Sequence, residues 1–221
     1  MSGPSDPNGI AGPGWPPPPP PVPAPPPGPP TRPTPATPAA EPASATVPLL
    51  MAAVAGASVA VALGTYGRVH EPTGDSIATF GFPAVLPMKA WFTTAVALLA
   101  LAQLASALAM WGRLPGVRAS SAWVAPVHRW SGTVAFVVSL PVAYHCLWSL
   151  GFQDTDTRVL VHSLLGCAFY GAFATKLLAL RIERLPAWAL PVIGGLLVTC
   201  LTVIWLTSSL WFFTNVGFPG V

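Results

Sequence analysis

Three histidines lie within long apolar stretches of the sequence. These are His128, His145 and His162, and the same stretches contain no Asp or Glu. An ionisable side chain in an apolar environment is costly, so its presence marks a candidate functional site. Neutral imidazole is a ligand of haem iron, and two imidazoles at one level of a helix bundle form a bis-histidine site. The sequence therefore provides histidines that could bind haem iron, and it does not favour a proton or cation pump built on carboxylates.

His145 and His162 are the best placed pair for such a site. His145 stands six residues before Gly151 and His162 stands four residues after Arg158, which puts them about 9 Å and about 6 Å down their segments. Because consecutive membrane spans are antiparallel, we expect the two imidazoles at similar heights on neighbouring helices. Gly166, one turn after His162 on the same face, would leave room for a porphyrin plane. We therefore predict one haem b near the outer face, with iron bound by His145 and His162 and with Arg158 pairing with a haem propionate.

His128 is harder to assign as a haem ligand. Seventeen residues separate it from His145, a rise of about 25 Å and a rotation of about 100° around a straight helix. No second histidine is available at its level, so a second haem is not predicted. An interfacial structural role and one end of a conduction path both remain open for His128. The fourth histidine, His70, lies in a polar loop beside Glu71 and is expected to be solvated.

The segment around His128 carries a family resemblance. His128-Arg129-Trp130-Ser131-Gly132, with a histidine later in the same segment, resembles the His-Arg-x-x-Gly helix openings of ferric-reductase-like and related b-type cytochrome membrane domains. It also resembles uncharacterised small bacterial membrane proteins that join a proline-rich tail to such a bundle. The resemblance covers mainly residues 125–180. It implies a haem b cofactor and electron transfer, and it adds His128 to the candidate cofactor-binding residues.

The three cysteines show no spacing typical of a metal site or a disulfide framework. Cys146, Cys167 and Cys200 all lie in apolar stretches, and the sequence contains no CxxC. Free cysteine often behaves as a small buried hydrophobic residue. We interpret all three in that way rather than as disulfide partners or zinc ligands.

Five apolar segments must position these side chains. Each reaches the roughly 20 residues that a helix needs to cross about 30 Å of hydrocarbon. Only 8% of the 221 residues are charged and 52% are hydrophobic, whereas soluble domains carry about 25% charged residues. Backbone groups in lipid must bond to one another, so the segments are expected to be helical. The predicted fold is an all-α, polytopic transmembrane helix bundle with spans at about 47–66, 90–111, 126–150, 159–180 and 188–213.

Residues 1–45 form a separate, proline-rich region ahead of the helical domain at 46–215. The region holds six consecutive prolines from Pro16 to Pro21. Proline fixes φ and has no N–H to donate, so such a stretch cannot build a packed core and is expected to be disordered. A semi-rigid tether in polyproline II conformation is the simpler interpretation. A docking strip for a proline-recognising partner is the alternative.

The distribution of basic residues predicts the orientation. With the tail on the cytoplasmic side, the inner loops and helix ends carry six Lys or Arg and the outer ones carry three. Excess positive charge favours the cytoplasm, so we expect the N-terminus inside, the C-terminus outside and a multi-pass protein of a bacterial cytoplasmic membrane. The net charge of +3 is too small and dispersed to indicate nucleic-acid binding.

Two functions remain open from the sequence, and whether the chain is an enzyme is not determined. The first is a b-type haem protein in electron transfer. The chain shows no flavin- or nicotinamide-binding fingerprint, so electrons would come from a redox partner or a quinol. The second is a cofactor-free structural or accessory membrane protein, surrounded by lipid, whose tail recruits partners. A small transporter is disfavoured, because no internal repeat is visible.

Overall fold

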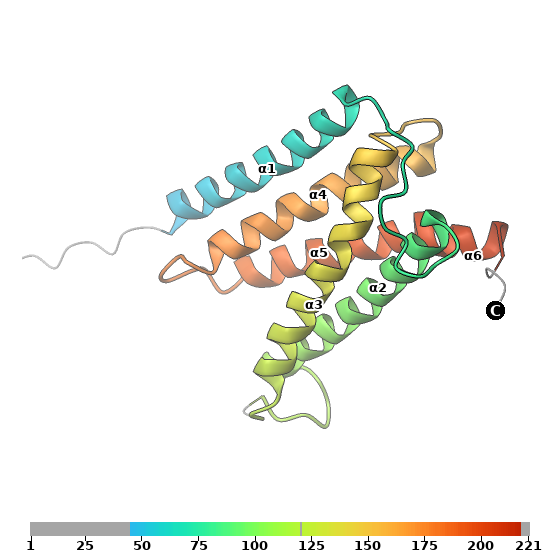
Figure 1. Ribbon diagram of the computed structural model, residues 1–221. Helices are drawn as coiled ribbons and strands as arrows, with labels where there is room; N and C mark the ends of the chain where they lie inside the picture. The colour runs from blue at the N-terminus through green and yellow to red at the C-terminus, as the bar shows by residue number, and fades with distance from the viewer. Residues whose placement is uncertain (1–44, 120, 218–221) are drawn as a thin grey trace, which may run out of the picture. The chain divides into compact units, whose positions relative to one another are not determined.

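The computed structural model describes residues 45–119 and 121–217. This part of the chain contains helices and no strands, which confirms the predicted all-α class (Figure 1). The elements are α1 Thr46–Val69, α2 Val85–Met110, α3 Val124–Tyr144, the π-helical turn η1 His145–Ser149, α4 Thr157–Ala179, α5 Ala189–Trp205, the π-helical turn η2 Leu206–Leu210 and α6 Trp211–Asn215.

The chain divides into two units, Met1–Pro42 and Ala43–Val221. The second unit holds all the helices described above. The predicted proline-rich tail at 1–45, with its proposed partner, lies outside the described residues except for Ala45. The tail therefore stays a prediction.

Five helices are long and apolar enough to cross a membrane, as the sequence predicts. They are α1, α2, α3 continued by η1, α4, and α5 continued by η2 and α6, with lengths of 23 to 27 residues. Large apolar side chains on all five are exposed. A water-soluble protein rarely exposes so much apolar surface, whereas lipid accepts it. The chain is a multi-pass, membrane-spanning helical protein; its exposed apolar side chains include Val61, Leu98, Val137, Leu164 and Leu196.

The second span begins earlier than predicted. The sequence analysis placed its start near residue 90, after Pro87, but α2 begins at Val85 and includes that proline in its first turn. The first turn is the part of a helix that tolerates proline, because its N–H groups have no partner within the helix.

The start of α4 is fixed by a side-chain cap. Asp156 caps it by accepting a hydrogen bond from the Val159 amide at 2.9 Å.

The helices alternate in direction, so the bundle has two ends. We call the end with loops 70–84 and 150–156 the near end, and the end with loops 111–123 and 180–188 the far end. α1 packs on α4, α2 packs on α3, and α5 contacts both α4 and α2 (Figure 1).

α1 and α4 approach each other closely at two glycines. A Cβ atom built on Gly56 would lie 2.4 Å from the carbonyl oxygen of Gly171, and one built on Gly171 would lie 2.5 Å from the carbonyl oxygen of Gly56. Small residues at a helix crossing let two backbones pack tightly in lipid. This reciprocal contact is therefore what allows α1 to pack against α4.

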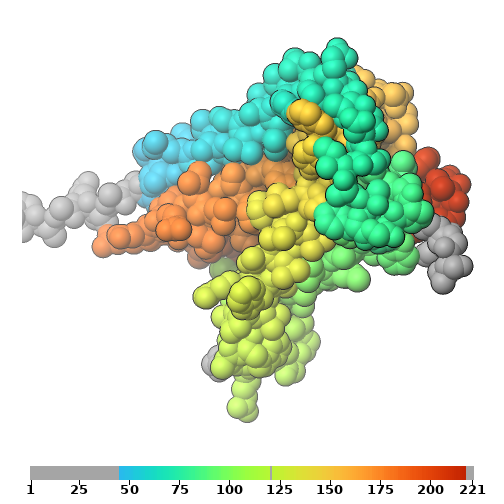
Figure 2. All heavy atoms as spheres, in the orientation of Figure 1, coloured from blue at the N-terminus to red at the C-terminus, as the bar shows by residue number. Residues whose placement is uncertain are grey.

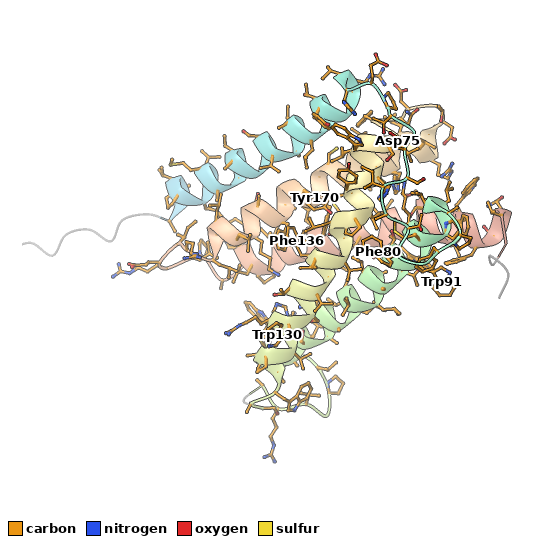
Figure 3. All side chains as sticks on the ribbon, viewed as in Figure 1. Asp75, Phe80, Trp91, Trp130, Phe136 and Tyr170 are labelled. Atoms are coloured by element: carbon orange, nitrogen blue, oxygen red, sulfur yellow. The ribbon has the colours of Figure 1, made fainter. Side chains whose placement is uncertain are left out.

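α3 and α4 meet through aromatic side chains near the middle of the bundle. Phe136 stacks on Phe173 with ring centroids 4.4 Å apart, and the Tyr170 hydroxyl lies 2.9 Å from Ser139 Oγ. Figure 3 shows Phe136 and Tyr170 between these two helices. The contacts hold α3 and α4 together on the far-end side of the site described next.

Candidate functional site

A cavity of about 440 Å³ lies in the near-end half of the bundle. Its walls come from α2, from α3 with η1, from α4, and from α5 with η2 and α6, and Ser139 and Tyr170 stand among its lining residues. Most of the wall is apolar. Polar side chains with reactive or charged groups lie within this apolar wall: Lys89, Cys146, Arg158, His162, Ser163 and Thr207.

Both π-helical turns contribute to this cavity. η1 supplies Cys146 and Leu147, and η2 supplies Thr207 and Ser208. A π turn interrupts the regular hydrogen-bond ladder of an α-helix and occurs often at functional sites. Their coincidence at one cavity identifies it as the candidate functional site.

The local sequence accounts for where the two turns occur. Pro141 lies inside α3, one turn before η1, and has no N–H to contribute to the helix ladder. In η2 the hydroxyls of Thr207 and Ser208 donate to the carbonyls of Val203 and Ile204, at 2.7 Å and 2.6 Å. Such bonds compete with the backbone and bend helices. Pro141 and the Thr-Ser-Ser run at 207–209 are the sequence signals from which the turns could have been anticipated.

The structure holds His162 in the wall of the cavity in a defined tautomer. Its Nδ1 lies 3.2 Å from Thr207 Oγ1. That hydroxyl already donates to the Val203 carbonyl at 2.7 Å, so it accepts from the ring and Nδ1 carries the proton. Nε2 is then the ring nitrogen that carries the lone pair, and the His162 side chain is also within hydrogen-bonding reach of the Cys146 thiol. A second hydrogen bond of this kind is how proteins orient a metal-ligating histidine.

Two cations line the same cavity. Arg158, one turn before His162, donates to the Thr207 carbonyl at 2.8 Å and lies 4.2 Å from the centroid of the Trp211 ring. Lys89 approaches from α2, and none of the described residues that line the cavity is Asp or Glu. Arg158 also pairs with Asp156, with 3.7 Å between its guanidinium nitrogen and a carboxylate oxygen, so its charge is partly neutralised beside the cavity. The wall therefore suits a ligand with an apolar body, and Lys89 is the cation of the wall for which no ion pair is seen among the described residues.

Gly166 leaves open space where the sequence analysis expected it. Gly166 lines the cavity, and a Cβ atom built on it would meet nothing within 4 Å. A larger side chain at this position would extend into unfilled volume without clashing with the fold.

This space gives a first test of the site. We expect Gly166→Leu to lower the amount of bound ligand severalfold and to leave the thermal stability of the protein unchanged, because the side chain fills the cavity without displacing protein atoms. Gly195→Leu is the matched control, since a Cβ there also meets nothing within 4 Å and Gly195 does not line the cavity. Equal ligand content in both variants would show that the space beside Gly166 is not a binding site.

His145 lies outside the cavity wall. It is only 1% exposed, its Nδ1 donates to the Pro141 carbonyl at 2.8 Å, and its Nε2 is buried with no hydrogen-bond partner among the described residues. The residues that line the cavity include His162 and not His145. The structure therefore does not bring the two predicted ligands into one wall, and their pairing stays a prediction.

His128 lies at the far end and is bound to α2. Its Nδ1 lies 2.9 Å from Ser106 Oγ, and its carbonyl accepts a hydrogen bond from the Gln103 side chain. A Cβ atom on Gly132 would lie 3.1 Å from atoms of the same Gln103 amide. Gly132 thus makes room for the Gln103 side chain. These contacts favour the interfacial structural role for His128.

Cys146 is one of the polar cavity residues that the sequence analysis did not assign to a site, together with Lys89, Ser163 and Thr207. Cys167 and Cys200 are buried, as expected for small hydrophobic residues, but Cys146 is only partly buried. It lines the cavity, and its thiol interacts with the side chains of His162 and Lys89. One sequence signal was available, since Cys146 follows Ser139 by two helical turns and therefore shares its face.

In the described part of the chain, no three His, Cys, Asp or Glu side chains come together in an arrangement that could hold a metal ion. A ligand set for a bare ion is therefore not found there. A haem brings four ligands of its own and needs only one or two from the protein.

Residues 49–220 match the model of a family of unknown function, DUF6529. The chain belongs to this family. The matched residues include almost all of the five spans and every cavity residue named above. Nothing matches the chain among curated proteins or among solved structures. The predicted membership of an uncharacterised membrane-protein family is confirmed, whereas the comparisons give no support to a relationship with ferric-reductase-like or b-type cytochrome domains.

Proposed function

We propose that this chain is an integral membrane b-type haem protein that takes part in electron transfer, with one haem in the near-end cavity. The observation that carries the proposal is the composition of a single cavity wall. It combines an apolar lining, an imidazole, open space beside Gly166 and two cations. An apolar macrocycle with two carboxylates and an iron atom matches each of these features.

Several residues of the cavity could help to hold the group. His162 would supply a nitrogen ligand, and Thr207 would orient its ring through the contact at Nδ1. Lys89 and Arg158 are the cations nearest to where the propionates would lie; Arg158 is positioned by its bond to the Thr207 carbonyl and also pairs with Asp156 at 3.7 Å. The haem would supply the one-electron chemistry, and the apolar wall would exclude water and influence the reduction potential.

The predicted orientation of the chain supports a proposal for how electrons would arrive. Six of the nine Lys and Arg residues near helix ends lie at the far end, which favours a cytoplasmic far end and an outward-facing cavity. A donor would therefore be a quinol in the membrane or a redox partner on the outer side. The predicted second ligand is His145, whose Nε2 is buried and unpartnered.

The test is a reduced-minus-oxidised visible spectrum of the detergent-purified protein, with a pyridine haemochrome assay on the same sample. We expect a stoichiometric b-type spectrum. A colourless protein, produced with an adequate haem supply, would contradict the proposal. The chain would then be a cofactor-free accessory membrane protein with a proline-rich arm.

A further inference from the structure

We propose that a groove between α1 and α4 binds one phospholipid of the near-end leaflet, and that it selects a headgroup with a phosphate and a primary ammonium group, the chemistry of phosphatidylethanolamine. This lipid site does not depend on the proposed function.

The groove exists because α1 and α4 touch at one level and separate towards the near end. A Cβ atom built on Gly56 would lie 2.4 Å from the Gly171 carbonyl oxygen. About two helical turns further along α1, a Cβ atom built on Gly64 would have the Cys167 sulfur as its nearest neighbour outside its own helix, at 3.8 Å. The space that opens in this half of the α1–α4 contact has a volume of about 500 Å³.

The lining of the groove suits a hydrocarbon chain. Small, partly buried residues lie beside larger apolar side chains that are exposed, and both helices are membrane spans, so the groove faces lipid. Lipid offers an apolar environment everywhere, so van der Waals contact alone would hold an acyl chain there and would select no particular lipid. Selectivity must therefore come from the headgroup. The apolar lining includes Ala60, Gly64 and Ala168, and Val61, Val69 and Leu164.

An ion pair lies at the near end of the groove. Arg68 lines the groove one residue before the end of α1, where a span meets the headgroup region. Its Nη1 donates to Asp154 Oδ2 at 2.9 Å. This bond uses one of the five guanidinium N–H groups and one of the two carboxylate oxygens. The side chains are 58% and 48% exposed, so both charged groups can still contact a ligand.

The ion pair is complementary to a zwitterionic headgroup. Its charges cancel, so it would not favour an anionic lipid over others. A phosphate beside Arg68 and an ammonium group beside Asp154 would each form charge-assisted hydrogen bonds. A primary ammonium group has three N–H donors for the carboxylate, whereas the quaternary ammonium of choline has none. A glycerol headgroup carries no cation for Asp154.

The first test uses native mass spectrometry of the full-length chain. The protein is released from vesicles that contain equal amounts of phosphatidylethanolamine, phosphatidylcholine and phosphatidylglycerol with the same acyl chains. We expect one retained lipid per chain, with phosphatidylethanolamine severalfold ahead of the other two. Equal retention of the three lipids would overturn the inference.

A pair of glycine variants tests the groove itself. Gly64 lines the groove and not the haem cavity, so Gly64→Leu should lower the retained lipid severalfold without changing the haem content. Gly195→Leu is the matched control, because Gly195 lies on another span and lines neither space. Unchanged lipid retention in Gly64→Leu would contradict the proposed site.

Two exposed headgroup variants keep the test decisive if Gly64→Leu does not fold. Arg68→Gln should weaken the retention of all three lipids. Asp154→Asn should shift the preference towards phosphatidylglycerol, because it leaves Arg68 as an unpaired cation at the groove. A preference for phosphatidylethanolamine that survives both changes would overturn the assignment. A colourless protein that still selects phosphatidylethanolamine would refute the proposed function and leave this inference standing.

Discussion

His162→Ala is expected to reduce the haem-to-protein ratio of the purified protein at least tenfold. His162 is the one imidazole among the described residues that line the cavity, so its loss leaves no nitrogen ligand in the wall. Loss of a ligand should exceed the roughly 10- to 100-fold cost of losing a residue that supports one. The pyridine haemochrome assay measures the ratio directly. The fold should survive, because the side chain is only partly buried and faces a cavity.

His128→Ala is the matched control for this result. Both changes remove one imidazole from a membrane span, but His128 contacts Ser106 and the α2 helix at the far end. We expect His128→Ala to keep the full haem content and to lose some thermal stability. A protein that stays coloured without His162 and becomes colourless without His128 would show that the haem is at the far end.

Gly171→Ala is expected to destabilise the protein, although alanine normally favours a helix over glycine. The added Cβ would lie 2.5 Å from the Gly56 carbonyl oxygen and 2.9 Å from Ala60 Cβ, so α1 and α4 must separate. Overpacking of this kind typically costs about 1–3 kcal/mol. The measurement is the thermal unfolding midpoint in detergent, followed by size-exclusion chromatography with fluorescence detection.

Gly195→Ala in α5 makes the same chemical change but is expected to shift the thermal unfolding midpoint in the opposite direction. A Cβ at this exposed position meets nothing within 4 Å, so only the helix preference remains, worth about 1 kcal/mol in favour of alanine in water. The midpoint should stay the same or rise. Equal behaviour of the two variants would mean that the Gly56–Gly171 contact does not hold α1 in place.

The five spans could be predicted from the sequence because each is a continuous apolar run of sufficient length. Hydropathy reports which residues avoid water, and it does so without knowledge of which helices touch. It therefore identified the spans but placed the start of α2 late, since Pro87 was taken as a boundary and the structure uses it within the first turn.

The site could be predicted only in part. The depth of His162 follows from its distance along the helix, but its partner Thr207 lies 45 residues away on another helix, and no periodicity reveals that pairing. Cys146 was interpreted as a buried hydrophobic residue because it lies in an apolar stretch and belongs to no CxxC pair. In the structure it continues the cavity-facing row of α3 that begins at Ser139, but the sequence does not reveal which face of that helix borders a cavity.

The π turn η2 also limits how the length of this chain can change. A π turn holds one residue more than an α-helical turn, so a deletion within 206–210 would restore a regular helix and rotate the residues beyond it by about 100°. The span of 27 residues would still cross the bilayer. Trp211, however, would turn away from Arg158, over which its ring now lies at 4.2 Å. Insertion into the membrane would tolerate such a deletion and the cavity would not, so the residue count between α5 and α6 is set by the site and not by the thickness of the lipid.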